Sequence, residues 1–221
     1  MPSIFTIGHS THPIEEFLAL LSQHQILALA DVRSYPSSKR WPQFNQDELQ
    51  RALERVGIEY RWMKPLGGRR TSKNADSPHV VWQIPAFRAY ADYADGEDFR
   101  TGLEELITLA ERKRIAYMCS EGLWWRCHRR LISDHLTVRG WTVMHLLPTG
   151  KVIAHALPDF ARIENGRLVY DVKTTAELFS GSPSLRGRGQ GVRLHLWRFE
   201  PHHRQWRQRR RYRLREAEPF D

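Results

Sequence analysis

The sequence predicts an α/β fold in which about five parallel strands form a sheet with helices on both faces. Short apolar runs alternate, over the first two thirds of the chain, with segments whose apolar residues recur at helical spacing. The connections are short, and this alternation favours a parallel sheet covered by helices. With 221 residues and 41% hydrophobic side chains, the chain can bury a full core. Its two cysteines do not indicate a fold built on disulfides.

Each element is assigned from its own signal. The predicted strands are the apolar runs at residues 3–10, 26–34, 58–64, 115–121 and 141–148, and the predicted helices are residues 11–24, 46–57, 87–113 and 127–140. Pro13 lies just inside the first helix, where proline is well tolerated. Gly57 and Gly140 end the second and fourth helices, and Gly96 interrupts the third.

The pattern changes after Pro148. Asn165-Gly166 lies between two extended segments and predicts a β-hairpin. Further on, residues 192–199 alternate apolar and basic side chains, which suits a C-terminal basic hairpin or arm. We therefore divide the chain into an α/β core domain at residues 1–148, a hairpin and linker extension at 149–185, and an arginine-rich arm at 186–221.

The net charge of +9 is concentrated in this arm, where eleven arginines face four acidic side chains. The other 185 residues are close to neutral, with 23 basic and 21 acidic side chains. Arginines interleaved with aromatic residues suit phosphate contact and base stacking, so we expect the arm to bind nucleic acid. The arginines assigned to this role are Arg207, Arg209, Arg210, Arg211 and Arg213. The alternative is that they form the solvated face of a hairpin.

The sequence also predicts a cytoplasmic location. No N-terminal segment has the basic flank and apolar run of a signal peptide, and no stretch of about 18 apolar residues occurs. In a reducing cytoplasm both cysteines would be free thiols. We expect no membrane partner, no cofactor and no bound metal.

Polar or glycine-rich residues follow every predicted strand. In a parallel sheet the loops after the carboxyl ends of the strands meet at one edge, where ligands bind. This arrangement predicts a single cleft lined by His9, Asp31, Arg33, Glu121, Cys127 and Arg129. Because loops are polar in any case, the pattern by itself also fits an ordinary sheet edge.

Five motifs in order resemble the bacterial domain-of-unknown-function 488 family. They are TIGHS at 6–10, DVRSYPSS at 31–38, LGG at 66–68, FRAYADY at 87–93 and MCSEGLWWRCHRRLIS at 118–133. The resemblance implies an α/β domain in which the strand-end motifs form one pocket, and it names no activity. The family pattern would accept a small residue or proline at Trp124 and Trp125, and the basic arm lies outside the pattern.

The cysteines are the candidate nucleophiles. Cys127 is predicted in the first turn of the fourth helix, where the helix dipole and Arg126, Arg129 and Arg130 would favour a thiolate. His128 and Glu121 are candidate base and orienting acid, although His9 from another strand end is better placed as the base. Two alternatives stay open. Cys119 and Cys127 can simply line the pocket, or they can bind zinc with His128 and His9, although their spacing lacks the tight Cys-x-x-Cys hook.

The arginines and glycines near these strand ends predict an anion site. Guanidinium groups match phosphate in bidentate geometry, and a helix N-terminus offers unpaired N–H groups. The assigned anion-binding residues are Arg33, Gly67, Gly68, Arg126, His128 and Arg129. Asp31 could act as an acid or base or could hold Arg33, and Arg129 could instead pair with Glu121.

Two functions follow from these residues. The first is an enzyme acting on a phosphate-bearing substrate, a nucleotide or a base in nucleic acid, with Cys127, Cys119, His9, Asp31 and Glu121 as its catalytic residues. The second is a non-catalytic nucleic-acid-binding accessory protein whose pocket holds an anion without turnover. Oligomeric state does not follow from the sequence.

Overall fold

The protein, described here by a computed structural model over residues 2–71 and 74–171, is built around a six-stranded sheet. The strands are β1 (Ser3–Gly8), β2 (Ala28–Asp31), β3 (Glu59–Trp62), β4 (Ile115–Cys119), β5 (Thr142–Leu146) and β6 (Val152–Ala154). Their order is β3-β2-β4-β1-β5-β6. The five predicted strands are all present and parallel to one another. The sequence reading missed β6, a short strand antiparallel to β5 at the sheet edge.

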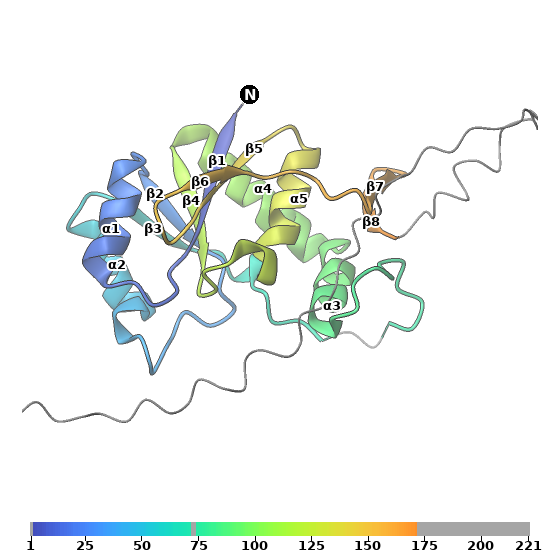
Figure 1. The fold of residues 1–221 in the computed structure, drawn as a ribbon, viewed down its shortest axis with the longest axis horizontal. Helices are drawn as coiled ribbons and strands as arrows, with labels where there is room; N and C mark the ends of the chain where they lie inside the picture. Colours follow the sequence, from blue (N-terminus) through green and yellow to red (C-terminus); the bar gives the residue numbers. More distant parts are fainter. Residues whose placement is uncertain (1, 72–73, 172–221) are drawn as a thin grey trace, which may run out of the picture. The chain divides into compact units, whose positions relative to one another are not determined.

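Helices cover both faces of this sheet (Figure 1), as predicted. They are α1 (Ile14–Gln23), α2 (Gln46–Glu54), α3 (Pro85–Ala94), α4 (Glu97–Arg112) and α5 (Arg129–Val138). Buried side chains of α1 and α2 form one core, and those of α3, α4 and α5 form the other. Side chains of β2 alternate between the two cores, because successive residues of a strand point to opposite faces of the sheet. Leu29 belongs to the first core, and Ala28 and Ala30 belong to the second.

The helix boundaries confirm most of the predicted signals. Gly96 separates α3 from α4 as the N-cap of α4. Two positions are corrected. Pro13, predicted just inside the first helix, is the N-cap residue before α1. Cys127 was predicted inside the first turn of α5, but it precedes the helix with extended backbone angles, φ −127° and ψ 149°. The difference comes from a 3₁₀ turn at Trp124–Arg126. The Cys127 N–H donates to the Trp124 carbonyl oxygen at 3.1 Å, so Cys127 closes this turn instead of beginning α5.

The predicted Asn-Gly hairpin is present as β7 (Ala161–Glu164) and β8 (Arg167–Tyr170). Asn165 and Gly166 both have positive φ angles, 50° and 78°, as a type I′ turn requires. Leu168 and Tyr170 are buried in the core on the α3–α5 side, so the extension packs against the first 148 residues up to the end of β8. The arm at 186–221, with the five arginines assigned to nucleic-acid binding, lies outside the described residues.

Within the described part of the chain, every helix is too short or too polar to cross a lipid bilayer.

Candidate functional site

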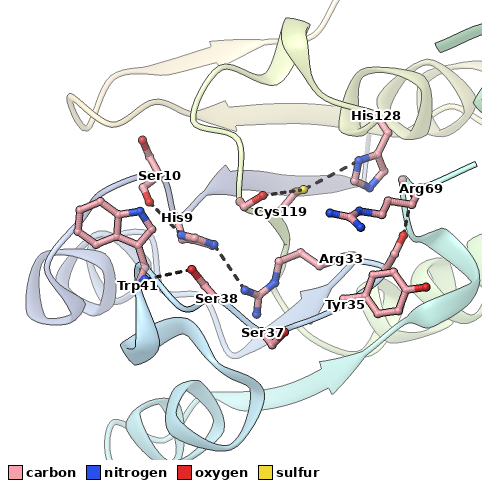
Figure 2. Close-up of a pocket in the computed structure, with 13 residues that line it drawn as sticks. His9, Ser10, Arg33, Tyr35, Ser37, Ser38, Trp41, Arg69, Cys119 and His128 are labelled. Carbon is pink, nitrogen blue, oxygen red and sulfur yellow. Dashed lines mark hydrogen bonds between the residues drawn. The ribbon is translucent and has the colours of Figure 1, made fainter. Parts of the chain in front are cut away.

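A cavity of about 690 Å³ lies at the carboxyl ends of β1, β2 and β4, where the parallel topology predicts a site. It is lined by His9, Ser10, Arg33, Ser34, Tyr35, Ser37, Ser38, Trp41, Gly68, Arg69, Cys119, Ser120 and His128. Figure 2 shows the labelled side chains around this space: they come from the ends of β1, β2 and β4, from the loop after β2, from the segment after β3 (Arg69) and from the residue before α5 (His128). We call this space the anion cavity after the anion site that the sequence predicts; two arginines and five serines are among its lining residues.

Arg33 forms the floor of the anion cavity and is fixed by Asp31 at the end of β2. Its Nε lies 2.9 Å from Asp31 Oδ1 and its Nη2 lies 2.6 Å from Oδ2. Asp31 is fully buried and also accepts a hydrogen bond from Tyr60 Oη at 2.8 Å. A charge-assisted bidentate pair of this kind has strong directional preference. These hydrogen bonds hold Nε and Nη2 on the Asp31 carboxylate and leave Nη1 directed toward His9.

His9 directly follows β1, and its imidazole lines the same cavity as Arg33. Its Nδ1 lies 3.1 Å from the Ser10 carbonyl oxygen and its Nε2 lies 3.5 Å from Arg33 Nη1. Burial and the nearby Arg33 charge lower the pKa of His9 to about 4. The ring stacks on Phe44 with centroids 4.1 Å apart. The tautomer that fits carries its proton on Nδ1 and presents the Nε2 lone pair to Arg33.

Arg69 is the cationic group of the cavity that the sequence reading missed. It is exposed, its backbone N–H donates to Ser34 Oγ at 2.8 Å, and its side chain points into the cavity in Figure 2. The hydroxyls of Ser34, Ser37 and Ser38 lie in the loop after β2 and were missed with it. The signal was the polar run Ser-Tyr-Pro-Ser-Ser directly after a strand end. Serine hydroxyls and guanidinium groups are donors that an oxyanion accepts from.

Both cysteines lie close to His128, which together with Cys119 lines the anion cavity. His128 Nδ1 lies 3.5 Å from Cys127 Sγ and 3.9 Å from Cys119 Sγ. His128 Nε2 lies 3.0 Å from the carbonyl oxygen of Val32, so Nε2 carries the proton and Nδ1 presents its lone pair to the thiols. Cys119 and His128 also line a second cavity of about 220 Å³, together with Cys127, Glu121 and Arg126.

Each thiol shifts the pKa of the other, because the two are buried next to each other. Burial opposes a thiolate on Cys127, but hydrogen bonds from Cys119 and the neighbouring Arg129 outweigh it and lower the pKa of Cys127 to about 6. The same hydrogen bond, together with burial, raises the pKa of Cys119 to about 12. The pair therefore favours a thiolate on Cys127, the sulfur nearer the N-terminus of α5, and a protonated thiol on Cys119.

The remaining predicted site residues lie around these cavities in different roles. Arg129 is 1% exposed, and its guanidinium donates to Thr6 Oγ1 at 3.0 Å and to the Glu121 backbone carbonyl. The Glu121 carboxylate is instead hydrogen-bonded to the Leu123 N–H at 3.3 Å. Arg129 is thus tied to the ends of β1 and β4 and is not among the residues that line the anion cavity.

The structure therefore distributes the predicted cleft over two adjoining cavities. His9, Arg33 and Cys119 line the anion cavity, and Glu121 and Cys127 line the second. Asp31 lies behind Arg33. His9 and Cys119 belong to neighbouring strand ends, since the His9 N–H donates to the Cys119 carbonyl oxygen at 3.0 Å.

The two glycines and two tryptophans singled out by sequence differ in position. Gly68 lines both cavities and abuts His128, while Gly67 packs against Ser34 and is not a lining residue of either. Trp124 stacks on His145 with centroids 4.0 Å apart, so it covers the core. Trp125 is 43% exposed.

Comparison with known families yields one match. A family model described as "Domain of unknown function DUF488" matches residues 13–136, which include β2, β3, β4 and most of α5. Neither a curated protein nor a solved structure matches the chain.

Proposed function

The chain belongs to the DUF488 family, and we propose that it is an enzyme that binds a phosphate-bearing small molecule, such as a nucleotide, and reacts with it through Cys119. The observation that carries this proposal is the composition of one cavity. Arg33, Arg69 and several serine hydroxyls face the wall formed by Cys119 and His128. An anion-binding group and a nucleophile with a base thus share one space at a sheet edge.

Phosphate suits this cavity because of how its cationic groups are held. The Arg33 guanidinium is fixed by Asp31, so binding an anion would not require ordering that side chain. Arg69 is exposed, and within the described residues it forms no ion pair with a carboxylate, so it supplies an uncompensated positive charge. Serine hydroxyls complete a set of donors that can surround a tetrahedral oxyanion.

Cys119 is the preferred nucleophile because it lines the anion cavity, whereas Cys127 opens only to the second one. His128 Nδ1, 3.9 Å from Cys119 Sγ, is the base, and the Val32 carbonyl orients its ring. Because burial and Cys127 raise the pKa of Cys119 to about 12, the step we propose is concerted: His128 takes the thiol proton as sulfur bonds to an electrophilic atom of the substrate, and the electron pair of the broken bond leaves with the leaving group.

A labelling experiment with iodoacetamide tests both halves of this proposal. Inorganic phosphate or a nucleoside monophosphate should slow alkylation of Cys119 and raise the melting temperature, because a ligand at 100 times its Kd stabilises by about 2.7 kcal/mol. Arg69→Ala should abolish both effects with little change in the unliganded melting temperature, because this side chain is exposed. Arg112→Ala, which removes an exposed arginine on α4 outside the cavity, is the matched control.

The two halves can fail separately. If neither phosphate nor nucleotide changes melting or labelling of the wild type, the anion site is absent. If the anion binds but leaves the alkylation rate of Cys119 unchanged, the thiol does not share the cavity with the anion, the enzyme proposal is wrong, and a non-catalytic binding protein explains the cavity better.

A further inference from the structure

We propose that Cys119, Cys127 and His128 form a binding site for one thiophilic divalent cation of the Zn²⁺ type. This inference does not require the proposed function, although it adds a form of regulation to it, because the ion would occupy the same sulfur that we propose as the nucleophile. No metal was expected from the sequence, since the cysteines lie eight positions apart rather than in a tight hook. The fold supplies the proximity that the spacing lacks.

The geometry of the three donor atoms carries the proposal. Cys119 Sγ, Cys127 Sγ and His128 Nδ1 all lie within 4.8 Å of one another. Tetrahedral zinc, with bonds of about 2.3 Å to sulfur and about 2.0 Å to nitrogen, holds such a sulfur and nitrogen about 3.5 Å apart. The two nitrogen–sulfur separations here are 3.5 and 3.9 Å. Small side-chain shifts would therefore close the three donors around an ion.

The surroundings of His128 are those of a metal ligand. Its Nε2 donates to the Val32 carbonyl oxygen, which fixes the ring and directs the Nδ1 lone pair at the two sulfurs. Tyr90 packs against the same ring with centroids 5.2 Å apart. On the other side Gly68 leaves the room that the ring needs, because a Cβ there would lie 2.3 Å from Nδ1. Three elements thus hold the imidazole in one orientation.

The charges around the site favour thiolate ligands. Two thiolates and a divalent ion form a neutral set, which a buried position tolerates better than a lone charge. Cys127 lies at the N-terminal end of α5, one residue before the N-cap His128, where the helix dipole favours a negative charge. Both sulfurs are at most 7% exposed, so bulk water would not compete strongly for the ion.

Three protein ligands leave one coordination position open. Cys119, Cys127 and His128 all line the second cavity, which leaves a space of about 220 Å³ beside the three donors. A water molecule or a small ligand could occupy it. With the ion bound, both sulfurs are ligands and their reaction with an alkylating agent is blocked. Metal binding and the thiol chemistry of the proposed function would therefore exclude each other.

Cobalt and zinc titrations of the full chain test the site. We expect one Co²⁺ to bind with thiolate-to-cobalt charge-transfer absorption and the intense visible bands of tetrahedral coordination. One equivalent of Zn²⁺ should bleach both and protect Cys119 and Cys127 from iodoacetamide, as read by mass spectrometry. Co²⁺ binding without charge-transfer absorption would place the ion on histidines elsewhere in the chain, and Zn²⁺ that leaves alkylation unchanged would likewise overturn the proposal.

Substitutions identify the ligands. Cys119→Ser and Cys127→Ser should each reduce the charge-transfer intensity by about half and weaken Zn²⁺ binding by more than about 100-fold, which exceeds the usual loss for outer-shell changes. His128→Asn should keep the charge-transfer band and lose affinity. His24→Asn, on the far end of α1, is the control and should bind as the wild type does. Should a serine variant fail to fold, the wild-type spectrum and its protection pattern still decide the question.

Arg69→Ala separates this inference from the proposed function. The variant should bind Co²⁺ and Zn²⁺ with wild-type affinity, because Arg69 is not one of the three ligands, while it loses the phosphate effect. Wild-type protein that binds metal but not phosphate would retain the metal site and remove the anion site. Phosphate binding without thiolate–metal absorption would do the reverse.

Discussion

Asp31 and Arg33 form a buried ion pair at the end of β2, which fixes the position of a side chain that lines the cavity. Asp31 is fully buried and accepts hydrogen bonds from Arg33 and from Tyr60 Oη. Burial, with the Asp31 charge next in weight, raises the pKa of Tyr60 well above its usual value, so Tyr60 stays a donor. Of the two sequence readings of Asp31, acid–base group or holder of Arg33, this geometry favours the second.

Removing the carboxylate should therefore cost stability. Asp31→Ala leaves the buried Arg33 guanidinium without its partner, and we expect a loss of about 3 to 5 kcal/mol in the free energy of unfolding, measured by urea denaturation. Glu59→Ala removes a carboxylate from exposed partners, Arg61 and Lys113, and should cost less than about 1 kcal/mol. Equal losses in the two variants would contradict the supporting role of Asp31.

Among the elements, α5 serves both the candidate site and the core. The two residues before it, Cys127 and His128, belong to the candidate site, and its buried side chains belong to the core on the α3–α5 side. The sequence correctly predicted this helix and its glycine end, but it placed Cys127 inside the first turn. Periodicity could not reveal the 3₁₀ turn at Trp124–Arg126, because Trp and Arg are compatible with either type of helix. That turn makes Cys127 extended, and this conformation accompanies its approach to Cys119 and His128.

The buried end of α5 predicts acid sensitivity. Burial, with the nearby Arg139 charge, lowers the pKa of His135 from 6.5 to about 4, and the ring packs on Phe99 at 4.8 Å between centroids. A folded-state pKa below the unfolded value means that stability is fully present above pH 6.5 and falls as the pH drops toward 4. We expect this residue to contribute a loss of about 3 kcal/mol over that range, with roughly one proton taken up on unfolding.

Urea denaturation of wild type and His135→Gln between pH 7 and about pH 4.5 measures this contribution, because the slope of stability against pH counts bound protons. The variant should show a shallower decline. A parallel decline, or an NMR titration of the folded wild type that gives His135 a pKa above 6.5, would contradict the prediction.

For the whole molecule, the sequence predicted the parallel sheet and the edge at which its polar strand ends meet. That inference works because parallel topology alone brings the carboxyl ends together. It could not tell which side chains turn inward at those ends. Asp31 and Arg129 form hydrogen bonds within the protein and do not line the cavity. Arg69 lines it from a loop whose path depends on a tertiary contact with Ser34. The convergence of His128 with both thiols likewise depends on how α5 meets β2.

The last prediction concerns the arginine-rich arm, residues 186–221. The core on the α3–α5 side extends as far along the chain as Tyr170, which is fully buried. Residues 1–185, which precede the arm, are close to neutral in charge. Deleting the arm should therefore leave a cooperative unfolding transition near that of the full chain. It should also remove most of the affinity for DNA or RNA, because eleven arginines leave with it. Binding measured at two salt concentrations, beside thermal melts, checks both parts: the full chain should lose affinity steeply with salt, and the shortened chain should bind weakly at either concentration. Global unfolding of the shortened chain would mean that the arm completes a core, and unchanged nucleic-acid binding would place the contact surface within residues 1–185.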